Sequence, residues 1–216
     1  MASVAVIDYG MGNLHSIAKA LEYVASGTRV QVSHDPKTIL HADRVVFPGV
    51  GGIRHCMEEL RRLELDDIVR EVATTKPLLG ICLGLQALLE FSEENGGTNC
   101  INIIPGKVKR FSGSIRGLSS GQATLKVPHM GWNQIHHEMN HPLWKNIRSG
   151  SRFYFVHSYY AEPTNPENWA GATDYGIRFA AALARDNIFA VQCHPEKSQQ
   201  PGLALLSNFL QWDGQA

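Results

Sequence analysis

Long apolar runs are absent from this sequence of 216 residues. A helix that crosses a membrane needs about 18 or more consecutive apolar residues, so the sequence predicts no membrane span. The N-terminal residues Met1–Val6 also lack the basic stretch that precedes the apolar core of a secretory signal. We therefore interpret them as the start of the first strand of a folded domain.

An excess of charge of either sign is also absent. The 20 lysines and arginines balance 20 aspartates and glutamates, so no net electrostatic field attracts nucleic acid or an anionic membrane. The hydrophobic fraction of 44% and the charged fraction of 19% are typical of a globular protein with an ordinary core. No repeat, low-complexity tract or linker divides the chain, and we expect one domain over residues 1–216.

Cysteine is scarce, and none of the four cysteines forms a CxxC pair. Zinc ligation by cysteine is therefore disfavoured, because structural zinc sites use closely spaced thiols. Without a secretory signal, the thiols are expected to be reduced, as in a cytoplasmic protein. Cys56 and Cys100 are interpreted as core residues, which is a common role of a free thiol.

Strand and helix patterns alternate in the first half of the chain. Strand patterns occupy residues 3–9, 29–32, 44–47 and 77–81, and helical patterns occupy residues 14–24, 53–62, 65–75 and 84–91. Repeated strand–helix–strand units predict right-handed crossovers and a parallel sheet covered on both faces. The sequence therefore predicts an α/β fold.

The pattern changes from Gly106 onward, where short strands are separated by turns that contain Gly, Pro and Asn. They are expected at residues 107–111, 123–127, 132–136, 152–160, 169–174, 180–185 and 188–193. We expect these strands to be antiparallel additions to the sheet, with a last helix over residues 201–212. The segment 111–122, rich in Ser and Gly, receives no role.

Cys82 lies at the centre of Gly80-Ile81-Cys82-Leu83-Gly84, between a buried strand and a helix. This spacing is typical of a nucleophile elbow, in which a tight turn exposes the reactive side chain. Glycines flank the turn because larger side chains would collide with the neighbouring strand and helix. The start of a helix stabilises a thiolate, and the N–H of Leu83 is placed to donate to an oxyanion. Cys82 is therefore the predicted nucleophile.

A cysteine nucleophile needs a base whose tautomer is fixed by a third group. Most histidines lie in polar turns or on helical faces, where we expect solvated side chains: His34, His41, His55, His136, His137 and His141. His194 differs, because it follows an apolar strand at the sheet edge where α/β proteins place their active sites. Glu196 lies two residues on, across Pro195, and projects to the same side in extended geometry. We predict a triad of Cys82, His194 and Glu196.

With these motifs in place, the sequence resembles the class I glutamine amidotransferases, which carry a G-x-C-x-G elbow and a late H-P-E. Further matching segments lie at residues 8–13, 47–51, 128–133, 153–159 and 192–198. The resemblance therefore covers nearly the whole chain and implies the family's flavodoxin-like fold. Within the family, P-H-M-G-W-N (128–133) and V-H-S-Y (156–159) resemble the glutaminase subunits of imidazole glycerol phosphate synthases.

The resemblance also implies roles for further residues. Val50 and Gly51 belong to a strand that presents a backbone N–H to the oxyanion, and the glycines around Val50 make a peptide flip easy. The glutamine pocket is implied to contain Gly51, Gln86, His157, Ser158 and Tyr159, and the surface facing a partner subunit is implied to contain Asn13, Trp132 and Lys197.

The implied reaction is release of ammonia from glutamine, and it needs no metal or organic cofactor. Ammonia becomes protonated in neutral water, so direct transfer to a second active site is an advantage. No phosphate-binding loop or second catalytic cluster is visible in the sequence. The resemblance names the missing partner as a (β/α)₈-barrel cyclase. In that heterodimer, ammonia and a phosphoribulosyl-formimino nucleotide precursor give imidazole glycerol phosphate and an aminoimidazole carboxamide nucleotide.

Three alternatives stay open at this point. The chain could be a sister glutaminase, such as that of pyridoxal phosphate synthase, although the 128–133 and 156–159 segments argue against it. A stand-alone cysteine hydrolase or peptidase would share the elbow and would turn over without a partner. A non-catalytic regulatory module would be expected to have lost the triad, and all three residues are present.

Overall fold

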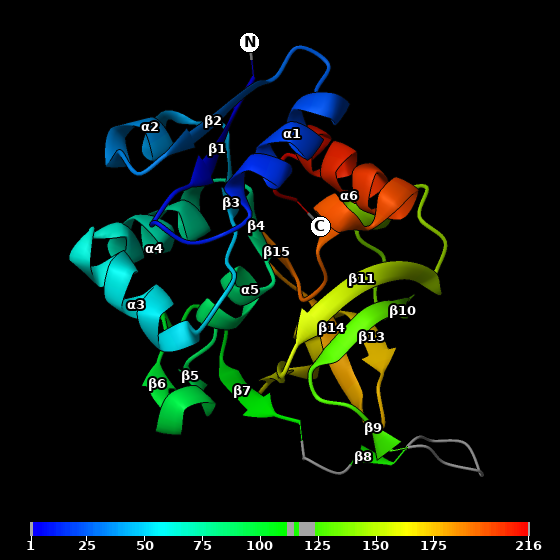
Figure 1. Cartoon of the computed structure of the whole chain (residues 1–216). Helices are drawn as coiled ribbons and strands as arrows, with labels where there is room; N and C mark the ends of the chain where they lie inside the picture. Colours follow the sequence, from blue (N-terminus) through cyan, green and yellow to red (C-terminus); the bar gives the residue numbers. More distant parts are fainter. Residues whose placement is uncertain (1, 112–114, 117–123, 216) are drawn as a thin grey trace.

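The computed structural model of the chain describes residues 2–111, 115–116 and 124–215 (Figure 1). Most of segment 111–122 therefore lies outside the described residues, as does residue 123 of the strand expected at 123–127. None of the helices in the described ranges has the length and apolarity that a bilayer crossing requires.

The first half forms the parallel part of one sheet, as the alternating pattern predicts. Its strands are β1 (Ser3–Ile7), β2 (Arg29–Ser33), β3 (Arg44–Phe47), β4 (Leu78–Ile81) and, from the far end of the chain, β15 (Ile188–Val191). They lie in the order β2-β1-β3-β4-β15, and every neighbouring pair is parallel. Because β15 lies beside β4, the segment that follows β15 reaches the sheet edge where β4 ends.

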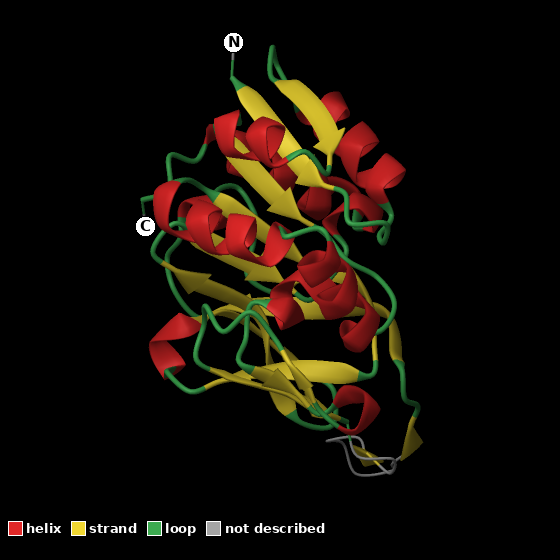
Figure 2. Cartoon of the chain, turned by 90° about the vertical axis from the view of Figure 1, so that its left-hand side faces the viewer, coloured by secondary structure: helices red, strands yellow, loops and turns green. Residues whose placement is uncertain are grey.

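Helices cover both faces of this sheet (Figure 2). They are α1 (Leu14–Val24), α2 (Pro36–His41), α3 (Ile53–Arg62), α4 (Leu65–Thr75), α5 (Leu83–Ala87) and α6 (Gln199–Gln211). Val4 and Val6 of β1 belong to the core that α1 and α6 cover, and Ala5 and Ile7 belong to the core that α2 to α5 cover. This split follows from the two-residue period of a strand.

Antiparallel strands extend the sheet beyond β15, which confirms the expected change in the second half. They include β7 (Gly106–Arg110), β10 (His129–His137), β11 (Ser151–His157), β12 (Tyr159–Pro163), β13 (Trp169–Asp174) and β14 (Arg178–Arg185). Three short strands were not expected: β5 (Phe91–Ser92), β6 (Thr98–Asn99) and β8 (Ile115–Arg116). The short strand β9 (Thr124–Leu125) lies within the strand expected at 123–127.

The strand expected at 152–160 is interrupted at Ser158. Before this residue β11 pairs with β10, and after it β12 pairs with β7 and β14. The chain therefore passes from one ladder to another at Ser158, whose carbonyl accepts a hydrogen bond from the N–H of Phe111 instead. The apolar pattern is continuous across the break because both strands are partly buried.

Two other expectations were wrong. The helix expected at 84–91 ends at Ala87, because the carbonyl of Leu88 turns away and accepts hydrogen bonds from Ile103 and Ile104. Its apolar spacing reflects a buried turn, since Leu88 and Leu89 are fully buried. His141 is not solvated but 6% exposed, with its ring against Phe189 and Trp212.

Candidate functional site

The turn between β4 and α5 holds Cys82 in an uncommon conformation. Its φ is 54° and its ψ is −106°, which is strained for a residue with a side chain. The N–H of Cys82 donates to the carbonyl of Val191 at 2.8 Å, so β15 fixes the turn. A Cβ on Gly84 would overlap the carbonyl oxygen of Phe47, and one on Gly80 would lie 3.0 Å from the Cβ of Ala190. The two glycines allow the close packing that positions the thiol.

His194 and Glu196 form a buried ion pair next to this turn. His194 begins the short 3₁₀ turn η4 (Pro195–Lys197), and its Nδ1 lies 2.9 Å from Oε1 of Glu196. The two side chains are 2% and 0% exposed. A carboxylate can only accept, so Nδ1 carries the proton and Nε2 is the nitrogen left for Cys82.

Opposing effects act on the pKa of His194. Burial lowers it, but the neighbouring Cys82 and Glu196 side chains outweigh burial and raise the pKa to about 10. Nε2 forms no hydrogen bond to any described residue in this conformation, although Cys82 and His194 are a close enough pair for Cys82 to raise the pKa of the ring. Such pairs tighten when substrate binds.

Hydrogen bonds hold the backbone of the H-P-E turn (194–196) against β11. The N–H of His194 donates to the carbonyl of Tyr154 at 2.9 Å. Ser198 Oγ donates to the carbonyl of His194 at 2.6 Å and accepts from the N–H of Tyr154 at 2.9 Å. A Cβ on Gly202 would overlap the carbonyl oxygen of Pro195, so α6 also packs directly against the turn.

The expected oxyanion donors are near the nucleophile, but they do not converge in this conformation. The N–H of Leu83 donates to the carbonyl of Gly49 at 3.4 Å and is therefore occupied, which differs from the expectation for Leu83. The C=O and N–H of a trans peptide point in opposite directions, so the N–H of Val50 points away from Leu83. The Tyr9 hydroxyl donates to the carbonyl of Pro48 at 2.9 Å and fixes the strand just before this peptide.

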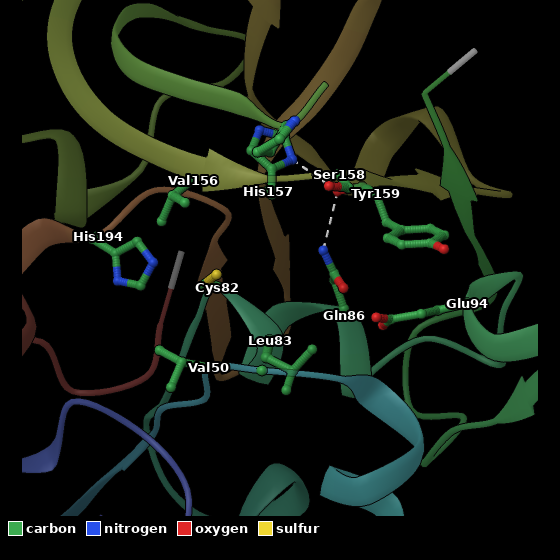
Figure 3. Close-up of a pocket in the computed structure, with 12 residues that line it drawn as sticks. Val50, Cys82, Leu83, Gln86, Glu94, Val156, His157, Ser158, Tyr159 and His194 are labelled. Carbon is green, nitrogen blue, oxygen red and sulfur yellow. Dashed lines mark hydrogen bonds between the residues drawn. The ribbon is translucent and has the colours of Figure 1, made fainter. Parts of the chain in front are cut away.

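A pocket of about 340 Å³ opens in front of Cys82 (Figure 3). It brings together all the residues that were expected to form the glutamine site: Val50, Gly51, Leu83, Gln86, His157, Ser158 and Tyr159, with Cys82 and His194. Its volume is at the lower end of the range for small-ligand sites.

Two polar residues of the site were missed by sequence reasoning. Glu94 lines the pocket on the side away from His194 (Figure 3), and its Oε2 accepts from the N–H of Ile53 at 3.0 Å. Nothing in its turn of Glu, Asn and Gly distinguishes Glu94 from a solvated carboxylate. Gln192 is fully buried, and its Nε2 donates to Cys82 Sγ at 3.7 Å. Its position two residues before His194 was the only available signal.

Gln86 connects these groups by hydrogen bonds. Its Nε2 donates to the carbonyl of Tyr159 at 3.1 Å and to Oε1 of Gln192 at 3.0 Å. Both amide hydrogens of Gln86 are thereby used. Its oxygen is left as the acceptor that a ligand in the pocket can meet.

The three residues expected to face a partner lie on separate elements, and none of them lines the pocket. Asn13 is half-buried at the start of α1, Trp132 on β10 is 38% exposed, and Lys197 lies in η4 with its Nζ 5.9 Å from the ring centre of Tyr154. Both α1 and β11 contact η4. Val50 and Met130 are 37% and 63% exposed. We call Val50, Met130 and Trp132 the apolar rim.

Among the described residues, no three His, Cys, Asp or Glu side chains are grouped as metal ligands.

Comparisons with known proteins agree on one family. The sequence pattern of the family described as "Glutamine amidotransferase class-I" matches residues 5–212. A protein of Nitrosococcus oceani, named imidazole glycerol phosphate synthase subunit HisH, is 61% identical over 214 residues and covers 99% of each chain. A subunit HisH 1 of the same synthase from Pseudomonas aeruginosa is 59% identical with the same coverage.

Solved structures share the fold at low sequence identity. The chain superposes on PurLQS of Thermotoga maritima with a TM-score of 0.71 and 16% identity, covering 97% of this chain and 98% of that one. A putative GMP synthase subunit of Thermoplasma acidophilum gives a TM-score of 0.69 and 18% identity, with 98% and 93% coverage. At these identities the likeness concerns the fold alone.

Proposed function

The chain belongs to the class I glutamine amidotransferases, and from this premise we propose that it is the glutaminase subunit of an imidazole glycerol phosphate synthase. It hydrolyses glutamine to glutamate and ammonia, and the ammonia is used by a cyclase subunit. The observation that carries the proposal is that Cys82 and His194 line one pocket while the buried side chain of Glu196 pairs with Nδ1 of His194. Full-length relatives at 61% and 59% identity carry the name of that subunit.

The proposed chemistry is acyl transfer through a thioester. Cys82 passes its thiol proton to Nε2 of His194 and attacks the side-chain amide carbon of glutamine, and the C–N bond breaks as His194 gives this proton to the departing ammonia. His194 then takes a proton from the water that attacks the thioester, and it returns this proton to the Cys82 sulfur as glutamate is released. Glu196 keeps the proton of the neutral imidazole on Nδ1 and balances the charge when both nitrogens are protonated.

The oxyanion site is proposed to form only after the Gly49–Val50 peptide rotates. In the present conformation the carbonyl of Gly49 occupies the N–H of Leu83. Rotation would withdraw that carbonyl and turn the N–H of Val50 toward the reacting carbon, so two donors would become available at once. A single donor of this kind contributes about 10²–10³ in rate. The resting chain is therefore expected to be a poor glutaminase.

The substrate is proposed to lie along the pocket from Cys82 to Glu94. The Glu94 carboxylate is the acidic group at the end away from His194, and it suits the α-ammonium of an amino acid (Figure 3). Gln86 and the backbone of Val156–Tyr159 line the space between these ends. This length and polarity suit glutamine itself rather than a peptide, which would lack the free ammonium.

The partner is proposed to be a (β/α)₈-barrel cyclase that covers the apolar rim and forms a heterodimer with this chain. Exposed large apolar side chains next to a catalytic pocket are typical of the core of an interface. Val50 belongs to both the rim and the oxyanion strand, so docking there can act on the peptide that must rotate. Ammonia would then enter the barrel, where the nucleotide precursor is converted to imidazole glycerol phosphate and an aminoimidazole carboxamide nucleotide.

Residues 1–216 are proposed to act as one amidotransferase domain in the cytoplasm. In support, the family pattern spans residues 5–212 and the four cysteines are free thiols, which suits a reducing compartment.

Glutamate release tests this function. The wild-type chain and Cys82→Ala are assayed with glutamine, each alone and with the cyclase subunit plus its nucleotide ligand. We expect strong release only from the wild-type complex. Release that survives Cys82→Ala would refute the proposed chemistry, and full activity of the isolated chain would favour a stand-alone hydrolase. Activation by a pyridoxal phosphate synthase instead of the cyclase would favour the sister glutaminase.

A further inference from the structure

Two buried histidines take no part in the chemistry described above: His157, which lines the pocket, and His129, which does not. His157 at the end of β11 is 6% exposed, and His129 at the start of β10 is 3% exposed. They face each other directly across the β10–β11 ladder. Nδ1 of His129 lies 2.8 Å from Nε2 of His157. Two histidines in direct hydrogen bond need a defined proton arrangement, because at most one of the two facing nitrogens can donate.

The surrounding acceptors and donors fix that arrangement. The carbonyl of Tyr159 lies 2.7 Å from Nδ1 of His157 and can only accept, so this Nδ1 carries the proton and Nε2 of the neutral ring accepts. His129 must then donate from Nδ1, which leaves its Nε2 as an acceptor. Nδ2 of Asn133 lies 3.2 Å from that nitrogen and donates to it. One set of tautomers satisfies every contact.

Both rings are held neutral, as this arrangement requires. Burial lowers the pKa of His129 to about 4. For His157, burial outweighs the hydrogen bond to Tyr159 and lowers the pKa to about 3. The ring of His129 also stacks on Tyr175 and Phe155, with ring centres 4.0 Å and 4.9 Å away. Aromatic packing therefore fixes the plane in which its Nδ1–H points.

The hydrogen bonds continue from this pair to the nucleophile. The carbonyl of Tyr159 accepts both from His157 and from Nε2 of Gln86, whose other amide hydrogen is bonded to Gln192. Gln192 in turn donates to Cys82 Sγ. His129 does not line the pocket, but its Nδ1–H satisfies Nε2 of His157 and so supports the tautomer whose Nδ1–H holds the Tyr159 carbonyl.

We propose that His129 is a positioning residue for glutamine, which acts by locking His157 in the Nδ1–H tautomer that anchors the Tyr159 carbonyl at the pocket wall. The inference rests on the glutaminase function proposed above. Without the His129 donor, His157 is free to move its proton to Nε2. Its bare Nδ1 would then face the Tyr159 carbonyl, and two acceptors repel each other. The Val156–Tyr159 wall would shift, and ground-state binding of glutamine would weaken.

Substitutions of His129 separate this role from simple packing. His129→Phe keeps the aromatic stack but removes the donor, whereas His129→Asn loses the stack but keeps an N–H close to the position of Nδ1. If His129 acts only through packing, His129→Phe is expected to have both the higher Tm and the lower KM of the two variants. The proposed role predicts that His129→Phe is the more stable variant, whereas His129→Asn binds glutamine more tightly. His136→Asn, an exposed histidine on the same strand, is the matched control.

The experiment measures glutamate release against glutamine concentration in complexes with the cyclase subunit and its nucleotide ligand. For His129→Phe we expect KM to rise by about tenfold, with kcat little changed and with a Tm above that of His129→Asn because the aromatic stack is kept. His129→Asn is expected to have a lower Tm but a KM closer to the wild type. Equal KM values for wild type and His129→Phe, or KM values that follow Tm, would overturn the proposal.

A second measurement does not depend on activity. NMR of the chain labelled with ¹⁵N-histidine reports the tautomer of each ring. The wild-type His157 is expected to be the Nδ1–H tautomer at pH 7, and in His129→Phe this signal is expected to change. A wild-type Nε2–H tautomer would refute the proposal even if the Phe variant failed to fold. An inactive wild-type complex would instead refute the glutaminase function. The NMR result would still decide whether His157 has the proposed tautomer.

Discussion

At the scale of single residues, the short separation of His194 and Glu196 is the feature with the clearest physical consequence. The pair is fully buried and joined at 2.9 Å. The pKa of His194 is raised from 6.5 to about 10 despite burial. A raised folded-state pKa stabilises the protein at pH values below the unfolded value, and this contribution is lost as the pH rises through the folded value. The relevant window therefore runs from about pH 7 to about pH 10.

Glu196→Gln tests both stability and catalysis at this pair. Without the carboxylate, the pKa of His194 is expected to fall, so Tm should decrease less between pH 7 and pH 10 than in the wild type. The comparison with the wild type cancels the contributions of other groups that titrate in the same range. The amide side chain introduced by the substitution can still fix the tautomer of His194, but it cannot balance the charge of the imidazolium. We therefore expect kcat to fall by about 10²–10⁴. Thermal unfolding at several pH values and glutamate release check the two effects. Parallel pH curves for the two proteins would contradict the assignment.

At the scale of elements, the close contact between β3 and α5 determines where the nucleophile lies. Gly84 has no room for a side chain, because a Cβ would overlap the carbonyl of Phe47. Gly84→Ala is therefore expected to push α5 away from β3. We expect a loss of about 1–3 kcal/mol in the free energy of unfolding and a fall in kcat, since Cys82 moves with the helix.

Gly52→Ala is the matched control for Gly84→Ala. The nearest atoms to a Cβ at Gly52 are at 3.6 Å and 3.7 Å, which is ordinary van der Waals contact, and its φ of −96° suits alanine. Denaturant unfolding of both variants should show a clear loss only for Gly84→Ala. Equal stabilities would mean that the elbow does not depend on this contact.

The elements also show how far local patterns can predict this structure. The helices at Ile53–Arg62 and Leu65–Thr75 follow from apolar spacing, because each buries one continuous face. The central parallel strands follow from short apolar runs, because both of their faces are buried. The elbow and the H-P-E turn follow from motifs whose chemistry requires a fixed spacing. The break at Ser158 depends on pairing with β7 and β14, and β5 also depends on pairing with β7. No local pattern records such pairing, and β5 and β6 are too short at two residues each to give a strand pattern.

Some residues of the site could not be predicted either, because their contacts with other parts of the chain leave no local sequence pattern. Glu94 reaches the pocket from a turn that no motif marks, and Gln192 meets Gln86 across 106 residues. His129 meets His157 only because β10 and β11 align in one register. These roles emerge from the three-dimensional arrangement, whereas Cys82 and His194 are marked by their immediate neighbours.

At the scale of the whole molecule, the exposed apolar rim is the surface that we propose meets the partner subunit. Trp132 is 38% exposed and packs edge-on against Tyr154 at 6.2 Å. Partly exposed tryptophans at interfaces are frequent binding hot spots. Trp132→Ala is expected to weaken binding to the cyclase by about 2 kcal/mol, or roughly 30-fold in Kd, with little change in Tm.

Tyr23→Ala is the control for Trp132→Ala, because Tyr23 is also aromatic and is 78% exposed near the other end of α1 from Asn13. Calorimetric titration of the cyclase subunit into each variant separates the two surfaces. Unchanged affinity for Trp132→Ala, or an equal loss for Tyr23→Ala, would place the interface elsewhere.

The central claim is that this chain supplies ammonia to a synthase by hydrolysing glutamine at Cys82. Formation of imidazole glycerol phosphate by the Cys82→Ala complex, with either glutamine or an ammonium salt as nitrogen source, tests it most directly. The account predicts that synthesis from glutamine is abolished while synthesis from ammonium continues at the wild-type rate, because only the source of ammonia has been removed. Continued synthesis from glutamine, or loss of synthesis from both sources in a correctly assembled complex, would contradict it.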